Sequence, residues 1–153
     1  MGYWLMKSEP DEFGIEDLIR SDKQITTWSG VRNFQARNFM RDDMKLGDLA
    51  FFYHSSCPAP GVVGTMKVVK AAYPDPTQFD PVSDYFDPKS KLDNPTWVAV
   101  DLQFVKQFPL VSLEALRKEP KLAEMRLLQK GNRLSVLPVN AAEWKRIMSM
   151  VEG

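Results

Sequence analysis

The chain has 153 residues, of which 44% are hydrophobic and 26% charged, proportions that are ordinary for one compact globular domain. Basic and acidic residues number 20 each, and a net charge of zero argues against a protein that coats nucleic acid through charge alone. No apolar run is long enough to cross a bilayer, no secretory signal is visible, and the single cysteine, Cys57, cannot form an internal disulfide, so we expect a cytoplasmic protein.

Hydrophobic periodicity predicts short strands and helices in the first half of the chain. A polar residue, a proline and acids at residues 8–11 are typical of a helix start. Gly64 interrupts a strand and indicates a bulge or a close backbone approach. The predicted elements are a strand over residues 3–6, a helix with an apolar stripe over 13–19, a partly helical segment over 28–44, and strands over 49–54 and 62–72.

Prolines divide the second half of the chain. Five of them fall within residues 74–95, so we expect no regular structure there, and a loop of this length is often a lid or a rim. Its aspartates should repel phosphate. Strands at irregular spacing with inserted helices predict an α+β domain around a curved sheet or barrel. The later predicted elements are a strand over residues 97–108, a short helix capped by Ser112, a helix over 121–129, an extended segment over 133–139, and a last helix that starts with a capping box of Asn140 and Glu143.

Charge is distributed unevenly along the chain. Residues 8–22 carry six acidic side chains and one arginine, whereas residues 117–133 carry six basic side chains and two acidic ones. A protein with separate acidic and basic faces can hold a short stretch of nucleic acid at a defined site. Two ordinary solvated helices would produce the same pattern, so both interpretations stay open.

Residues 28–41 have the composition of a ligand site. They include three arginines, two asparagines, one glutamine and three aromatic residues, with no acid among them. Arginine and amide side chains bind planar hydrogen-bonding edges and phosphates, and aromatic rings stack on bases. Trp28 precedes a turn at Ser29 and Gly30, so it is a candidate stacking platform, although tryptophan is more often a core residue.

Few side chains could carry acid–base or metal chemistry. His54 is the one histidine, and with Cys57 it cannot supply the four ligands of a structural zinc, so no metal and no cofactor are predicted. The favoured interpretation of His54 is a pocket residue that hydrogen-bonds to backbone or ligand. The alternative is an enzyme that acts on a nucleotide or modified base with His54 or Glu9 as acid/base. A third possibility is a module that binds a protein partner through residues 74–95.

The order and spacing of several segments resemble the EVE domain family over essentially the whole chain. The resemblance implies one domain over residues 1–153 with a PUA-like fold, a small β-barrel with flanking helices, in a stand-alone bacterial protein. It also implies a non-enzymatic pocket for a modified base, such as a methylated cytosine or adenine, in DNA or RNA. The segments that carry the resemblance are residues 3–10, 28–38, 52–55, 60–61, 73–88 and 133–136.

The resemblance assigns site residues by their positions in these motifs. Trp28 is expected to stack on the base, so Trp28→Ala should abolish binding and leave the fold intact. Ser56 and Leu137 depart from the family pattern, where asparagine and glutamine are common, and if either position touches the ligand the preferred base differs here. The implied base-binding residues are Trp28, Gly30, Val31, Asn33, Ser8, Glu9, His54, Ser55 and Ser135, and the implied phosphate-binding residues are Lys7, Arg32 and Arg133.

Overall fold

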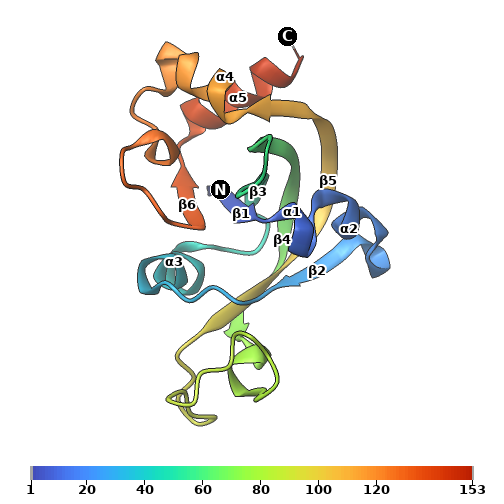
Figure 1. Ribbon diagram of the computed structural model, residues 1–153, viewed down its shortest axis with the longest axis vertical. Helices are drawn as coiled ribbons and strands as arrows, with labels where there is room; N and C mark the ends of the chain where they lie inside the picture. The colour runs from blue at the N-terminus through green and yellow to red at the C-terminus, as the bar shows by residue number, and fades with distance from the viewer. Residues whose placement is uncertain (1, 153) are drawn as a thin grey trace.

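The computed structural model describes residues 2–152 as a curved, six-stranded sheet with helices packed against it (Figure 1). The strands follow one another across the sheet in the order β2-β5-β4-β3-β1-β6. Strands β1 and β3 are parallel, and all other neighbours are antiparallel, which confirms an α+β architecture. The elements are β1 (Tyr3–Ser8), α1 (Pro10–Phe13), α2 (Ile15–Arg20), β2 (Ile25–Trp28), α3 (Phe34–Asn38), β3 (Leu49–His54), β4 (Gly61–Pro74), β5 (Val98–Ser112), α4 (Leu113–Lys118), β6 (Val136–Val139) and α5 (Ala141–Glu152).

Side chains alternate along the strands and divide the buried residues into two clusters, one on each face of the sheet. In β1, Trp4 and Met6 belong to the cluster that includes Leu18 of α2 and Ala36 of α3. Leu5 belongs to the other cluster, which includes residues of α4 and α5. A shift of one residue in β1 would exchange these faces, so burial on both sides fixes the register of the strand.

Irregular register curves the sheet. The pairing of β3 with β4 shifts between Phe52 and Tyr53, and the pairing of β4 with β5 shifts at four places. At Gly64 a Cβ atom would collide with the side chain of Ile15 and the carbonyl oxygen of Lys106, so the predicted close backbone approach is confirmed. The curvature brings β2 and the residues that lead into β6 to the same cleft, although these strands are the two edges of the sheet.

The predicted caps are present in the structure. The Ser112 hydroxyl oxygen accepts a hydrogen bond from the N–H of Ala115 (3.0 Å) at the start of α4. At the start of α5, the Asn140 N–H donates to Glu143 (3.0 Å), and the Glu143 N–H donates to the Asn140 side chain (2.8 Å). Both helices therefore begin where the sequence predicts.

Two predicted helices differ from the structure, and one strand, β2, was not predicted. The helix predicted from residue 8 is divided at Gly14, whose backbone is extended (φ −100°, ψ 176°). The helix predicted over residues 121–129 is wrong, because two 3₁₀ turns, Pro120–Leu122 and Arg126–Leu128, replace it. The extended backbone of Met125 between these turns lets neighbouring apolar side chains reach the same core cluster.

The proline-rich loop between β4 and β5, residues 75–97, has little regular structure, as predicted, but a buried side chain orders it. Gln78 is fully buried, and its Nε2 donates to the carbonyl oxygens of Asp75 (2.7 Å) and Trp97 (2.8 Å). The Trp97 indole N–H donates to Asp87 (2.8 Å). These bonds give the loop a defined shape, and it forms the yellow-green lobe of Figure 1.

No helix of residues 2–152 is long and apolar enough to span a membrane. The two ends of the domain predicted over residues 1–153, Met1 and Gly153, lie outside the described residues.

Candidate functional site

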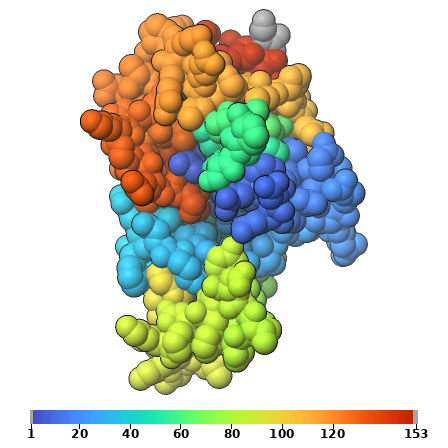
Figure 2. Space-filling model, in the orientation of Figure 1, coloured from blue at the N-terminus to red at the C-terminus, as the bar shows by residue number. Residues whose placement is uncertain are grey.

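A cleft of about 830 Å³ opens where five segments of the chain meet. Figure 2 shows these segments on one face, with the blue N-terminal segment among green, orange, cyan and yellow-green ones. A volume of this size lies within the range of about 300–1,000 Å³ that is usual for small-molecule sites. The cleft is lined by Lys7, Ser8, Glu9, Glu12, Phe13, Thr26, Thr27, Trp28, Ser29, Gly30, Val31, Arg32, Asn33, Ser55, Ser56, Asp84, Tyr85, Arg133 and Ser135.

The structure gathers eleven of the twelve residues that the resemblance implies, and the exception is His54. His54 ends β3, and its Nε2 accepts a hydrogen bond from the backbone N–H of Ile15 (3.1 Å). This bond requires a neutral ring protonated at Nδ1, and burial lowers the pKa of His54 below its usual value. The structure therefore supports the predicted bond to backbone and does not support a contact of His54 with the ligand.

Trp28 belongs to the core as well as to the cleft. Its side chain is 8% exposed and packs edge-on against Phe52, with ring centroids 5.5 Å apart. A ring this buried presents a small part of its surface to a ligand, and its removal would leave a cavity. We therefore revise the prediction for Trp28→Ala, which we now expect to lower the stability of the fold as well as to weaken binding.

The loop after β2 is shaped by Gly30 and Asn33. Gly30 has φ +81°, and a Cβ atom there would lie 2.8 Å from the ring of Tyr85, so glycine permits both the backbone conformation and the packing of that ring. The side-chain oxygen of Asn33 accepts a hydrogen bond from the N–H of Ala36 (3.0 Å). This bond caps α3 and leaves the side-chain NH₂ of Asn33 free to donate into the cleft.

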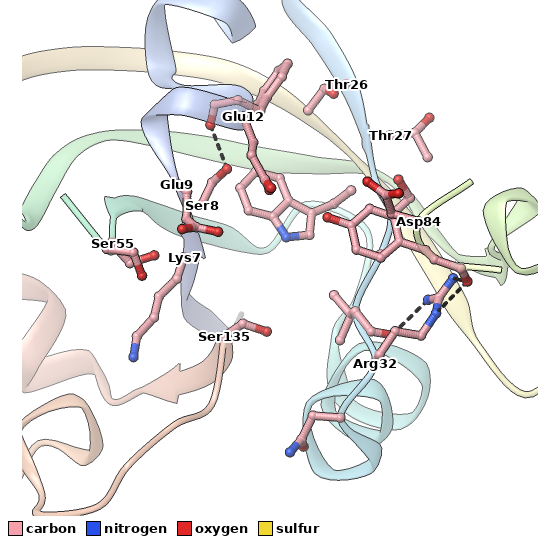
Figure 3. A pocket seen from close by; sticks show the side chains of 18 of the residues that line it. Lys7, Ser8, Glu9, Glu12, Thr26, Thr27, Arg32, Ser55, Asp84 and Ser135 are labelled. Carbon is pink, nitrogen blue, oxygen red and sulfur yellow. Dashed lines mark hydrogen bonds between the residues drawn. The ribbon is translucent and has the colours of Figure 1, made fainter. Parts of the chain in front are cut away.

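All five N–H groups of Arg32 donate to acceptors inside the protein. Nε and Nη2 donate to the carbonyl oxygen of Tyr85 (3.1 and 2.8 Å; Figure 3), and Nη2 also donates to the Thr77 hydroxyl (3.0 Å). Nη1 donates to the carbonyl oxygen of Val31 (3.0 Å) and to the Asp75 carboxylate (3.1 Å). No N–H group remains for a phosphate, so the structure does not support the predicted phosphate contact. Arg32 instead fastens the proline-rich loop to the loop after β2.

Asp75 is the acidic partner of Arg32, and we call this ion pair the Arg32–Asp75 clamp. Its carboxylate is fully buried and accepts hydrogen bonds from the N–H groups of Gly30 and Thr77 (both 2.8 Å), from the Thr77 hydroxyl (2.6 Å) and from Arg32. Burial alone would raise the pKa of Asp75, but these hydrogen bonds outweigh burial and lower the pKa below its usual value. Asp75 is thus a structural anchor, and the prediction that the aspartates of this loop repel phosphate does not describe its role.

Charged side chains of both signs line the cleft. Figure 3 shows Glu9 beside Lys7, Ser135 on the neighbouring segment, and Glu12 and Asp84 farther along the walls. Within residues 2–152, no ion pair involves Lys7 or Arg133, and burial lowers the pKa of Lys7. A basic side suits phosphates, and carboxylates accept hydrogen bonds from the amino groups of bases.

The sequence missed part of the cleft wall, above all Asp84 and Tyr85. Both belong to the proline-rich loop, which the sequence marks as a possible rim but does not connect with residues 28–33. The stretch that carries the resemblance over residues 73–88 was the one signal for them. In the part of the chain that the structure describes, no group of three or more His, Cys, Asp or Glu side chains is placed to hold a metal ion.

Comparisons with known proteins show the family to which the chain belongs. The family model of the EVE domain matches residues 2–150. Thymocyte nuclear protein 1 of Homo sapiens is 46% identical over 168 residues, which cover 98% of this chain and 74% of that protein.

Two solved structures resemble the whole chain. A crystal structure from Pseudomonas syringae has 52% sequence identity and a TM-score of 0.92, covering 97% of this chain and 98% of that one. The crystal structure of human THYN1 in complex with DNA that contains 5-methylcytosine has 44% identity and a TM-score of 0.94, covering 100% of this chain and 99% of that one. The likeness confirms the predicted PUA-like fold.

Proposed function

The chain belongs to the EVE domain family, and on this premise we propose that its cleft binds DNA at a modified cytosine. The observation that carries the proposal is the likeness to human THYN1, whose structure contains DNA with 5-methylcytosine. At 44% identity the likeness extends over the full length of this chain, so it includes every segment that lines the cleft.

The chemistry of the cleft suits a single base that has left its stack. Trp28 and Val31 supply apolar surface for a ring and a methyl group, and Asn33 supplies amide donors for the edge of the base. The acidic side chains that line the cleft can accept a hydrogen bond from the exocyclic amino group of cytosine. Extruding a base from a duplex costs a few kcal/mol, so an unpaired or mispaired base should bind more readily.

Flanking phosphates are proposed to bind on the side of Lys7 and Arg133. Neither side chain forms an ion pair within residues 2–152, and Arg133 ends the basic stretch of residues 117–133. Such contacts position a strand without reading its sequence. Because the net charge is zero, affinity for unmodified DNA should be low and should fall with added salt.

We further propose that the cleft binds its ligand without chemistry. The internal bond of His54 Nε2 supports this proposal, since it occupies the acceptor nitrogen of one of the two acid/base candidates of the enzymatic alternative. Glu9 remains as the other acid/base candidate of that alternative. If oligonucleotides that carry each modified base are recovered unchanged by mass after long incubation, the binding function stands; a change in mass that Glu9→Gln abolishes would establish the enzyme.

The test of binding is fluorescence anisotropy with short single- and double-stranded oligonucleotides. The set carries cytosine, 5-methylcytosine, 5-hydroxymethylcytosine or N6-methyladenine, in DNA and in RNA. We expect a preference of about tenfold for one modified cytosine in DNA, because a single methyl group in an apolar site contributes about 1–3 kcal/mol. Equal affinity for modified and unmodified strands would overturn the proposal, and a preference for RNA or for methylated adenine would redirect it.

A further inference from the structure

We propose that Phe34 is a second stacking platform, which takes the base next to the one in the cleft. This inference rests on the proposed function. Phe34 follows the cleft residue Asn33 in the chain and begins α3. It is 59% exposed, whereas Ala36 and Met40 on the apolar side of the same segment are fully buried. An exposed aromatic ring beside a base-binding cleft has the chemistry of a nucleic-acid contact.

A row of planar groups connects the cleft wall with Phe34. The Arg32 guanidinium lies over the rings of Tyr85 (5.6 Å) and Trp97 (5.3 Å). The rings of Trp97 and Phe34 are stacked, with centroids 4.9 Å apart and an interplanar angle of 29°. Figure 2 shows the cyan region that contains α3 next to the yellow-green loop. Phe34 is therefore the outer end of a stack whose inner end, Tyr85, lines the cleft.

Part of the Phe34 ring surface is open. The Arg37 guanidinium lies over the Phe34 ring, 4.9 Å from its centroid, and 5.9 Å from the centroid of Trp97. Phe34 is 59% exposed with both of these neighbours in place. The ring thus offers accessible aromatic surface beside a guanidinium, and both groups favour a base with its phosphate.

The ring is also held in place before any ligand arrives. Arg37 donates to the carbonyl oxygen of Thr96 (2.9 Å), and Trp97 is fixed by Asp87 and Gln78. A fixed ring loses little conformational entropy when a base stacks on it. Residues 28–41, the segment that contains Phe34 and Arg37, include no acidic side chain that would repel a phosphate.

The experiment uses a DNA pentanucleotide with a central 5-methylcytosine and 2-aminopurine on one side or the other, because stacking on an aromatic ring quenches 2-aminopurine fluorescence. With the wild-type chain we expect quenching at one of the two positions. Phe34→Leu keeps apolar volume but has no ring, and we expect it to weaken binding about tenfold and to remove the quenching. Phe34→Tyr should restore both, and Leu110→Ala, which truncates an exposed residue of β5, should behave like the wild type.

A second probe separates the platform from the cleft. The mononucleotide of 5-methylcytosine has no neighbouring base, so its affinity should be the same for the wild type and Phe34→Leu. Unchanged pentanucleotide affinity and quenching in Phe34→Leu would overturn the platform, as would an equal loss for the mononucleotide. Equal affinity of the wild type for pentanucleotides with cytosine and with 5-methylcytosine would overturn the proposed function. Loss of quenching in Phe34→Leu would still support the platform in that case, so the two failures can be told apart.

Discussion

Two walls of the cleft are held in place by different forces. The wall that contains Trp28 is part of the apolar core, where many small contacts fix each side chain. The wall that contains Tyr85 belongs to an irregular loop, and the polar Arg32–Asp75 clamp fastens it. The first wall cannot change without a loss of stability, whereas the second can move while the sheet stays folded. We therefore expect ligand choice to be adjusted mainly at the second wall.

Trp28→Ala is expected to have the largest effect on the free energy of unfolding. A small effect would contradict the difference between the two walls. Replacing a buried tryptophan by alanine typically lowers the free energy of unfolding by about 3–5 kcal/mol. Urea denaturation followed by circular dichroism measures this loss, with Trp28→Phe as a control that keeps more of the volume. A stability within about 1 kcal/mol of the wild type would show that this wall does not depend on the core.

Asp75→Asn tests the clamp with nearly unchanged volume. Hydrogen bonds to charged groups contribute about 1.5–3 kcal/mol, and the substitution weakens several of them, so we expect a loss of roughly 2–3 kcal/mol. Limited proteolysis within the proline-rich loop should become faster, while amide exchange in β1 and β3 should change little. If protection falls equally in the loop and in the central strands, the two walls are not independent.

The same carboxylate predicts a dependence of stability on pH. Because folding lowers the pKa of Asp75, its contribution is fully present above the pKa of an unfolded aspartate, about 4, and is lost as the pH falls through the lower folded value. The wild type should therefore lose its advantage over Asp75→Asn in acid. Urea denaturation of both chains between neutral pH and about pH 3 measures this difference, and an advantage that persists unchanged would contradict the assignment.

Arg133→Gln should have the smallest effect on stability, within about 0.5 kcal/mol, because it changes an exposed side chain without an ion pair in residues 2–152. Its expected effect is on binding. The slope of log affinity against log salt should fall by about 0.7–0.9 for one lost phosphate contact. Arg32→Gln, which changes an arginine of the clamp and no proposed phosphate contact, is measured for comparison. An unchanged slope in Arg133→Gln would show that Arg133 does not contact a phosphate.

The sequence predicts those parts of the fold that depend on local signals. The caps at Ser112 and Asn140 and the long strands follow from residue type and periodicity. Strand β2 has four residues and follows left-handed backbone at Lys23 and Gln24, so its pairing with β5, more than 70 residues later, has little local signal. The predicted helix over residues 121–129 failed because burial of apolar side chains in one core overrode local propensity.

For the site, the resemblance identified residues that the structure gathers, but it did not identify their bonds. Composition cannot show that Arg32 has no N–H group left for a phosphate, because all of its acceptors except the Val31 carbonyl oxygen lie more than 40 residues away along the chain. The same limit applies to His54, whose partner is the backbone N–H of Ile15. Whether a polar side chain faces a ligand or the protein is decided by tertiary contacts.

The two edges of the sheet face each other across the cleft, so the sheet resembles a ring that stops short of closure. How far the ring closes depends on the register shifts along β3, β4 and β5. Adding or removing a whole bulge at such a shift, so that the flanking side chains keep their faces, would widen or narrow the aperture without altering any side chain inside it. Length changes in the middle of the sheet are thus a route to ligands of different size that leaves the chemistry of the cleft intact.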